Sequence, residues 1–273
     1  MATFLFLHGS FHAAWNWHKV LPLLERAGHR GVALDLPGHG QDRTAPGKVT
    51  LDCCVRAVLR AIDGASGPVV LVAHSRNGIV ISQAAERAPE KVQGLVYLAA
   101  YLVPHGRSMM EYAQHDPGSL VVQNLELAFD WKFLPVLVRV LRHEWFARLC
   151  ARLLPRRFQV HRLKPSAYRE ALYHDCPDEI VELANVLLEA EPNWAGFAPL
   201  RLSRERYGRV PKVYVECLQD RAVTLPLQRR MLADTPVDRV YALDSGHSPF
   251  FSQPENLTRT LIESLGVFAP AAD

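Results

Sequence analysis

The sequence predicts an α/β fold with a mostly parallel sheet that helices cover on both faces. Two patterns in the first half carry this prediction. Short apolar runs rich in valine, leucine and aromatic residues predict strands at residues 4–7, 31–34, 69–73 and 95–98. Segments with helical spacing of apolar residues separate these runs, at residues 17–26, 51–62 and 78–87. Strands that alternate with helices of this length form crossover units, which build a parallel sheet buried on both faces.

A third pattern sets the domain organisation. The strand pattern stops after Val103 and returns only at residues 212–217 and 237–243, before a last helix at 255–265. Apolar residues between these points repeat at helical spacing, most clearly over residues 131–154, where arginines exclude a membrane span. We therefore expect one core, residues 1–103 and 207–273, interrupted by a helical cap (or lid) at residues 104–206.

Composition excludes several classes of protein. The 273 residues are 49% hydrophobic and 22% charged, which suits a large buried core and not a disordered chain. A formal net charge of +3 is too small to indicate nucleic-acid binding. The five cysteines are scattered, without a C-x-x-C pair, so we expect neither a disulfide framework nor a zinc site. The first residues lack the basic region of a signal peptide, and their apolar run is too short to span a membrane. These features predict a cytoplasmic protein.

The strongest chemical signal is V-V-L-V-A-H-S-R-N-G-I-V at residues 69–80, where a buried strand runs directly into a helix. It resembles the G-x-S-x-G nucleophile turn of α/β-hydrolases, which makes Ser75 the candidate nucleophile. Small residues two before and two after the serine let strand and helix pack closely. Ala73 meets this requirement, whereas Asn77 departs from it and Gly78 follows one place later. The alternative role for Ser75 is an ordinary helix N-cap.

The order serine, acid, histidine of α/β-hydrolases supplies the other two candidates. Asp220 follows the strand at 212–217, and His247 follows the strand at 237–243. Open α/β sheets bind ligands at such strand ends. Asp244, three residues before the histidine, is the alternative acid. We expect His247 to take the proton of Ser75 while Asp220 fixes the histidine tautomer.

The segment H-G-S-F-H-A-A-W at residues 8–15 follows the first strand. It resembles the H-G motif of short α/β-hydrolases, whose backbone contributes to the oxyanion hole. The resemblance assigns the two oxyanion donors to the backbone N–H groups of Ser10 and Arg76. We expect the Arg76 guanidinium to be a surface or cap contact, and His29, His143 and His161 to be solvated surface positions.

Five motifs together are similar to the plant methylesterase and hydroxynitrile lyase family and to its bacterial carboxylesterase relatives. They are H-G-S-F-H-A-A-W-N-W, A-L-D-L-P-G-H-G, A-H-S-R-N-G, Y-H-D-C and D-S-G-H-S-P-F-F-S-Q-P; over residues 121–165 the resemblance is poor. It implies hydrolysis of small carboxylic esters without a cofactor, or cleavage of cyanohydrins by the same triad. The lyases carry threonine where Gly9 stands and lysine where Ser248 stands. The positive charge of that lysine stabilises the cyanide as it leaves, and Ser248 carries no charge. Hydrolysis is therefore favoured.

The cap is basic. Residues 132–169 hold ten Lys or Arg residues and one acidic residue, Glu144. This pattern is typical either of a solvated helix face or of a site for an anionic substrate or partner. The expected ligand is a small-molecule ester or thioester that is apolar or anionic. The sequence does not decide between a monomer and a homodimer. We predict no metal, cofactor, nucleic acid or membrane span.

Four functions remain at this stage. The leading one is a serine esterase that works through an acyl-enzyme. A thioesterase or methylesterase of secondary metabolism is the second, and a lyase that cleaves a C–C bond is less favoured. The fourth is a hormone-type receptor that keeps the pocket for binding only.

Overall fold

A six-stranded parallel sheet forms the centre of the protein. The computed structural model describes residues 1–126 and 134–269. The strands are β1 (Thr3–Leu7), β2 (Arg30–Leu34), β3 (Val69–His74), β4 (Val92–Leu98), β8 (Lys212–Cys217) and β9 (Arg239–Leu243). They lie in the order β2-β1-β3-β4-β8-β9, with β3 near the middle. This sheet confirms the predicted fold class.

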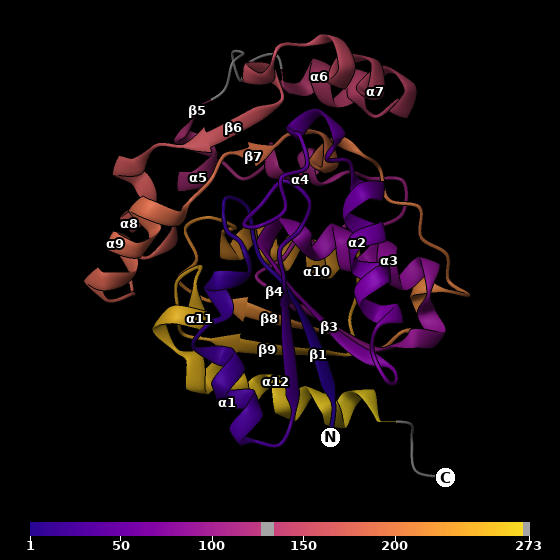
Figure 1. Cartoon of the computed structure of the whole chain (residues 1–273), viewed down its shortest axis with the longest axis vertical. Helices are drawn as coiled ribbons and strands as arrows, with labels where there is room; N and C mark the ends of the chain where they lie inside the picture. The colour runs from indigo at the N-terminus through magenta and orange to yellow at the C-terminus, as the bar shows by residue number, and fades with distance from the viewer. Residues whose placement is uncertain (127–133, 270–273) are drawn as a thin grey trace.

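Helices cover both faces of the sheet (Figure 1). One layer consists of α2 (Leu51–Asp63), α3 (Gly78–Arg87) and α10 (Leu225–Asp234); the other consists of α1 (Val20–Arg26), α11 (Pro249–Ser252) and α12 (Pro254–Phe268). Successive side chains of a strand point to opposite faces. In β3, Leu71 packs against the first layer, whereas Val70 and Val72 pack against the second. All three are fully buried, which explains the continuous apolar runs in the sequence.

The predicted core elements are present with small shifts at their ends. The strand expected from residue 95 already begins at Val92, and the one expected from residue 237 begins at Arg239. Residues 14–17 form a separate 3-10 turn, so α1 begins only at Val20. The helices α10 and α11 were not predicted. Pro226 and Pro249 stand in their first turns, where a proline is compatible with a helix.

The chain between β4 and β8 forms a cap above one edge of the sheet (Figure 1). Its helices are α4 (Met109–Ala113), α5 (Leu120–Gln123), α6 (Leu134–Leu141), α7 (Glu144–Leu153), α8 (Tyr168–Leu172) and α9 (Asp178–Leu187). Its strands β5 (Leu125–Glu126), β6 (Val160–Leu163) and β7 (Glu191–Pro192) form a small antiparallel sheet that the sequence pattern did not predict. Strands of two to four residues are too short for an alternating pattern to stand out.

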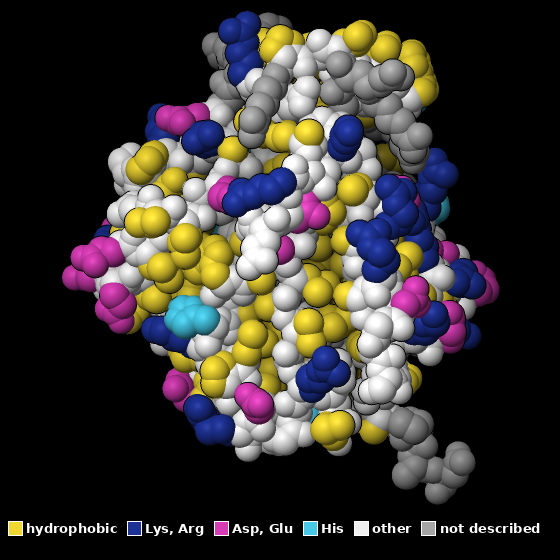
Figure 2. All heavy atoms as spheres, in the orientation of Figure 1, with side chains coloured by type: hydrophobic (Ala, Val, Ile, Leu, Met, Phe, Trp, Pro, Cys, Tyr) yellow, Lys and Arg dark blue, Asp and Glu magenta, His cyan; other side chains and the backbone are white. Residues whose placement is uncertain are grey.

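The helical pattern over residues 131–154 corresponds to two helices, α6 and α7, which are separated at Arg142 and His143. Residues 131–133 lie outside the described residues. On the face of the molecule in Figure 2, Lys and Arg side chains occur on both the cap and the core, with acidic side chains among them. Part of the basic cap is engaged within the protein, since Arg169 pairs with Asp178 and Arg157 lies over the Phe158 ring.

Neither a helix long and apolar enough to cross a membrane nor a group of side chains suited to a metal ion occurs within residues 1–126 and 134–269.

Gly78 lets α3 approach the chain that follows β4, and its replacement tests this contact. A Cβ atom at residue 78 would lie 2.5 Å from the Tyr101 carbonyl oxygen. We expect Gly78→Ala to lower the free energy of unfolding by about 2 kcal/mol, as overpacking does, when measured by urea denaturation. The matched control is Gly266→Ala, because a Cβ there meets nothing within 4 Å. In α12 this alanine should be neutral or stabilising by up to about 1 kcal/mol. Equal effects of the two changes would contradict the packing argument.

Candidate active site

The predicted site residues follow four strands of the central sheet at its carboxyl edge. Ser10 follows β1, Ser75 follows β3, Asp220 follows β8 and His247 follows β9. Because all these strands are parallel, their carboxyl ends lie along the same edge. The cap covers this edge, so the four loops lie between cap and core.

Among the described residues, three that are not glycine adopt positive φ angles, and all lie shortly after a strand of the central sheet. They are Phe11 (φ 67°) after β1, Ser75 (φ 55°) after β3 and Ala99 (φ 41°) after β4. Such conformations cost of order 1–3 kcal/mol each and persist only where surrounding contacts hold them. The chain that follows β4 holds the backbone of Ser75, since the Ser75 carbonyl accepts a hydrogen bond from the Tyr101 N–H at 2.9 Å. Strain at the nucleophile turn is what the G-x-S-x-G resemblance implies.

The atypical Asn77 does not prevent close packing behind the nucleophile. Its side-chain amide donates to the His8 carbonyl at 2.5 Å, which ties the nucleophile turn to the loop after β1. Gly78 provides the close approach to Tyr101. The small residue thus stands one place later than in the usual motif, and the asparagine supplies a hydrogen bond of its own.

His247 pairs with the acid that was preferred from the sequence. Its Nδ1 lies 2.7 Å from Asp220 Oδ2, and both side chains are buried. The other carboxylate oxygen of Asp220 accepts the backbone N–H groups of Ala222 (2.7 Å) and Val223 (2.9 Å). Because the carboxylate is fixed at both oxygens, it orients the imidazole with Nδ1 as the donor. Asp244 is exposed and accepts a hydrogen bond from Gln219 instead.

Two further contacts hold the His247 loop. His74 Nε2 lies 2.9 Å from the His247 carbonyl, and the two rings are 4.3 Å apart. Burial holds the pKa of His74 well below its usual range, so it is neutral and donates this hydrogen bond. From the cap, Asp175 accepts the Gly246 N–H at 2.7 Å. The Y-H-D-C motif at residues 173–176 therefore positions the histidine loop from above.

The loop after β1 is fixed by two neutral histidines. His8 accepts the Leu36 N–H at Nε2 (3.2 Å), so its Nδ1 carries the proton and donates to the Gly9 carbonyl (2.8 Å). His12 Nδ1 likewise donates to the Ser10 carbonyl at 2.7 Å, while its Nε2 faces the Tyr173 hydroxyl at 2.6 Å. Burial lowers the pKa of His8 to about 3 and that of His12 to about 4.

These contacts occupy the carbonyl groups of the loop and leave a donor free. The Phe11 N–H donates to Glu191 at 2.9 Å, whereas the Ser10 N–H has no acceptor among the described residues. The Arg76 N–H lies in the first turn of a helix, where backbone N–H groups lack helical partners. Both predicted oxyanion donors are therefore available to a ligand.

A cavity of about 80 Å³ lies between cap and core, several times the space that one water molecule needs. Ser75, His247, Ser10 and Arg76 all line it. Most of the remaining wall is apolar and comes from the cap, including Met109, Met110, Val121, Val122, Leu125 and Phe197. No hydrogen bond between the Ser75 hydroxyl and His247 is recorded among the described residues. Such catalytic contacts often tighten only with substrate bound.

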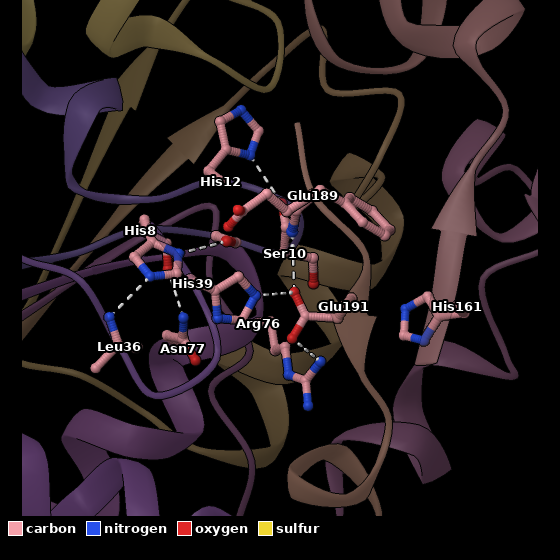
Figure 3. Close-up of polar contacts among 12 residues, drawn as sticks. His8, Ser10, His12, Leu36, His39, Arg76, Asn77, His161, Glu189 and Glu191 are labelled. Atoms are coloured by element: carbon pink, nitrogen blue, oxygen red, sulfur yellow. Dashed lines mark hydrogen bonds and ion pairs between the residues drawn. The ribbon is translucent and has the colours of Figure 1, made fainter. Parts of the chain in front are cut away.

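The Arg76 side chain departs from the sequence expectation of a surface position. It is buried and forms an ion pair with Glu191 of β7, so it is indeed a contact to the cap. Glu191 also receives the Phe11 N–H and lies 3.2 Å from His39 Nε2 (Figure 3). Burial alone would raise the pKa of Glu191, but the charges of Arg76 and His39 outweigh it and hold that pKa well below its usual range.

Sequence reasoning missed two residues of this site. Glu191 stands in a strand of two residues and carries no local signal. His161, expected at the surface, lies on β6 and lines the cavity beside Ser75. It shares a face of that strand with the buried Leu163, and this alternation is the signal that a recognised strand would have given.

A parallel sheet with a strained serine turn, an acid-paired histidine and a cap over their shared edge is the structure of an α/β-hydrolase. Comparison with protein families agrees, because the model of the alpha/beta hydrolase family matches residues 4–260. The chain belongs to this family.

Known proteins similar to the chain include plant esterases. Methylesterase 7 of Arabidopsis thaliana is 31% identical over 275 residues, which cover 97% of both chains. The crystal structure of the methylesterase MES16 from Arabidopsis has a TM-score of 0.77 and 25% identity, covering 97% of this chain and 99% of that one. Polyneuridine aldehyde esterase, with a TM-score of 0.80 and 23% identity, shares the fold over 96% of this chain and 98% of its own.

The buried Glu191 carboxylate should be essential for stability. We expect Glu191→Gln to lower the free energy of unfolding by about 3–5 kcal/mol, because it leaves the buried Arg76 without a counter-charge. Urea denaturation measures the change. The matched control is Glu189→Gln, whose partner Arg43 is largely exposed, and here the loss should stay below about 1 kcal/mol. Similar losses in the two variants would contradict the role of the buried pair.

The neutral histidines of the loop predict a pH dependence of stability. His8 and His12 remain uncharged in the folded protein down to about pH 3 and pH 4, but in the unfolded chain they bind protons below about pH 6.5. The unfolded state then holds more protons, so the free energy of unfolding falls as the pH falls from 6.5 towards 4. Each histidine contributes up to about 1.4 kcal/mol per pH unit in this window.

Urea denaturation across this range measures the slope. His39 acts in the opposite direction: burial alone would lower its pKa, but Glu191 outweighs this and raises it. Its stabilisation is therefore lost only as the pH rises above 6.5, outside the window used. A free energy of unfolding that is unchanged between pH 6.5 and about pH 5 would show that these histidines are not buried in neutral form.

Proposed function

We propose that the protein hydrolyses small carboxylic esters through an acyl-enzyme on Ser75. The observation that carries this proposal is the 2.7 Å hydrogen bond between Asp220 and His247, in a cavity that the strained Ser75 also lines. The similar plant methylesterases support the same reaction class.

In the proposed mechanism, Ser75 Oγ attacks the acyl carbon while His247 Nε2 takes the hydroxyl proton. Asp220 keeps Nδ1 protonated and stabilises the imidazolium that forms. The N–H groups of Ser10 and Arg76 bind the oxyanion. His247 then protonates the departing alcohol as the ester C–O bond breaks. It later takes a proton from the attacking water and returns it to Ser75 Oγ when the acyl–serine bond breaks and the acid leaves.

The lyase alternative fits the site less well. A cyanohydrin lyase needs a cation near the leaving cyanide, and the only Lys or Arg among the described residues of the cavity is Arg76, which Glu191 neutralises. Ser248 and Gly9 occupy the two lyase positions. A Cβ at Gly9 would lie 2.6 Å from His74 Nδ1, which leaves no room for a threonine there.

We assign different tasks to the two parts of the chain. The core, residues 1–103 and 207–273, carries the triad, and the cap, residues 104–206, supplies most of the apolar cavity wall. This wall favours apolar acyl or alcohol groups over anionic ones. We place the reaction in the cytoplasm, in keeping with the five free cysteines of the structure.

The Ser75→Ala variant tests the proposal on a panel of short-chain esters and matched thioesters. We expect the wild type to hydrolyse the esters and the variant to lose activity by about a thousandfold or more, because no other group of the site forms the acyl-enzyme. Thioester turnover above ester turnover would favour a thioesterase. The control is Ser252→Ala, in α11 and outside the cavity, which should keep wild-type rates.

Labelling with a fluorophosphonate separates an enzyme from a receptor. We expect stoichiometric labelling of Ser75 in the wild type and none in Ser75→Ala, together with turnover of the ester panel. Labelling without turnover of any ester or thioester would favour a receptor and contradict the proposed function.

A further inference from the structure

His161 is the polar group that the cap adds to the candidate ester cavity. It lies on β6, next to the strand that carries Glu191 (Figure 3). Its ring packs edge-on against Phe11 at 5.5 Å, on the loop that provides the Ser10 N–H. His161 and Ser75 line the same cavity, so a ligand that reaches the nucleophile passes within reach of this imidazole.

Asn193 fixes the tautomer of His161. The Asn193 side chain lies 2.9 Å from the Phe158 carbonyl through Nδ2. A carbonyl only accepts, so the NH₂ of the amide faces Phe158 and its oxygen faces the histidine. His161 Nδ1 lies 2.5 Å from that oxygen and therefore carries the proton. The backbone N–H of Asn193 donates to the Gln159 carbonyl at 2.9 Å, which holds the asparagine in place.

The other ring nitrogen, Nε2, is consequently an acceptor with no donor. None of the described residues bonds to it, and His161 is only partly buried and lines the cavity, which leaves Nε2 for a ligand. Burial also lowers the pKa of His161, which keeps the ring neutral. A neutral imidazole with its proton on Nδ1 offers only a lone pair at Nε2.

The other polar side chains of the cavity differ from His161 in this respect. Ser119 donates to the Ala222 carbonyl, and Arg76 is paired with Glu191. The hydroxyl groups of Ser10 and Tyr101 donate or accept as a ligand requires. The Asn193 amide oxygen already accepts the Nδ1 proton of His161. His161 Nε2 is thus an unengaged acceptor on a side chain of the cavity, and only a donor fits there.

We propose that His161 is a specificity-determining residue, which selects esters whose apolar body carries a hydroxyl or N–H group. This inference rests on the ester cavity of the proposed function. The donor of such a substrate binds Nε2 while the apolar body contacts the cap residues. An ester without a donor displaces water from Nε2 and leaves a buried acceptor unpaired, which lowers its affinity.

Binding to the Ser75→Ala protein tests the proposal without turnover. The probes are three sets of phenylpropanoic acid methyl esters, with a ring hydroxyl, methyl or methoxy group placed in turn at the ortho, meta and para positions. At one ring position or more, we expect the hydroxyl ester to bind about tenfold tighter, or better, than the methyl ester. The methoxy ester, which accepts but does not donate, should gain nothing over the methyl ester.

Variants in the same Ser75→Ala background separate His161 from the rest of the cavity. In His161→Phe, which keeps an aromatic ring beside Phe11, the ratio of the two dissociation constants should fall to about one. Asn193→Leu frees the tautomer and should lower the ratio as well. His115→Phe, an exposed histidine of the cap outside the cavity, should keep it.

A preference for the hydroxyl ester that the Ser75→Ala protein lacks at every ring position, or that survives the addition of His161→Phe, would overturn the proposal. Because these are binding measurements, they stand apart from the activity panel. Selective binding by the Ser75→Ala protein without hydrolysis by the wild type would reject the esterase and support the role of His161. Hydrolysis by the wild type without selective binding would support the esterase and reject the role of His161.

Discussion

The buried carboxylate of Glu191 joins the cap to the chemistry of the core. It binds the guanidinium of Arg76, one residue after the proposed nucleophile, and the N–H of Phe11, one residue after Ser10. Both proposed oxyanion donors therefore lie next to groups held by the same side chain. Charged groups are costly to bury, and only complete pairing makes such an arrangement stable. Arg76, His39 and a backbone N–H supply that pairing.

The same carboxylate helps to explain how strained backbone persists at the site. Phe11 and Ser75 adopt positive φ angles, which favour glycine, yet neither position is a glycine. Glu191 holds the Phe11 N–H, and the Tyr101 N–H holds the Ser75 carbonyl. Contacts from other segments thus over-determine both turns. Both strained residues line the cavity.

The sequence predicts well whatever depends on local pattern. A continuous apolar run located β3, and V-Y-V located β8, so the positions of Ser75 and Asp220 just after these strands followed directly. Partners that are distant in the chain carry no such signal. Glu191 lies 115 positions from Arg76, and no pattern near either residue announces the pair.

The position of His161 could not be predicted for a related reason. Whether a histidine faces a cavity depends on the element that carries it, and β6 has four residues. After His161, Arg162 is exposed and Leu163 is buried, as expected in a strand. This alternating pattern is too short to indicate a strand unless the partners β5 and β7 are known. The cap was therefore expected to be helical throughout.

Most cap residues that line the cavity differ from those that bind the loops of the core. Asp175 and Glu191 bind the loops of the core, towards the end of the cap segment. Val121, Leu125 and His161 face the cavity and lie in the stretch where the resemblance to plant esterases is poor. Ser119 both lines the cavity and donates to the Ala222 carbonyl, but apolar wall residues such as Val121 and Leu125 can change without breaking the hydrogen bonds that hold these loops. The proposed selection of substrates therefore depends mainly on the cap, whereas the proposed triad follows the strands of the sheet.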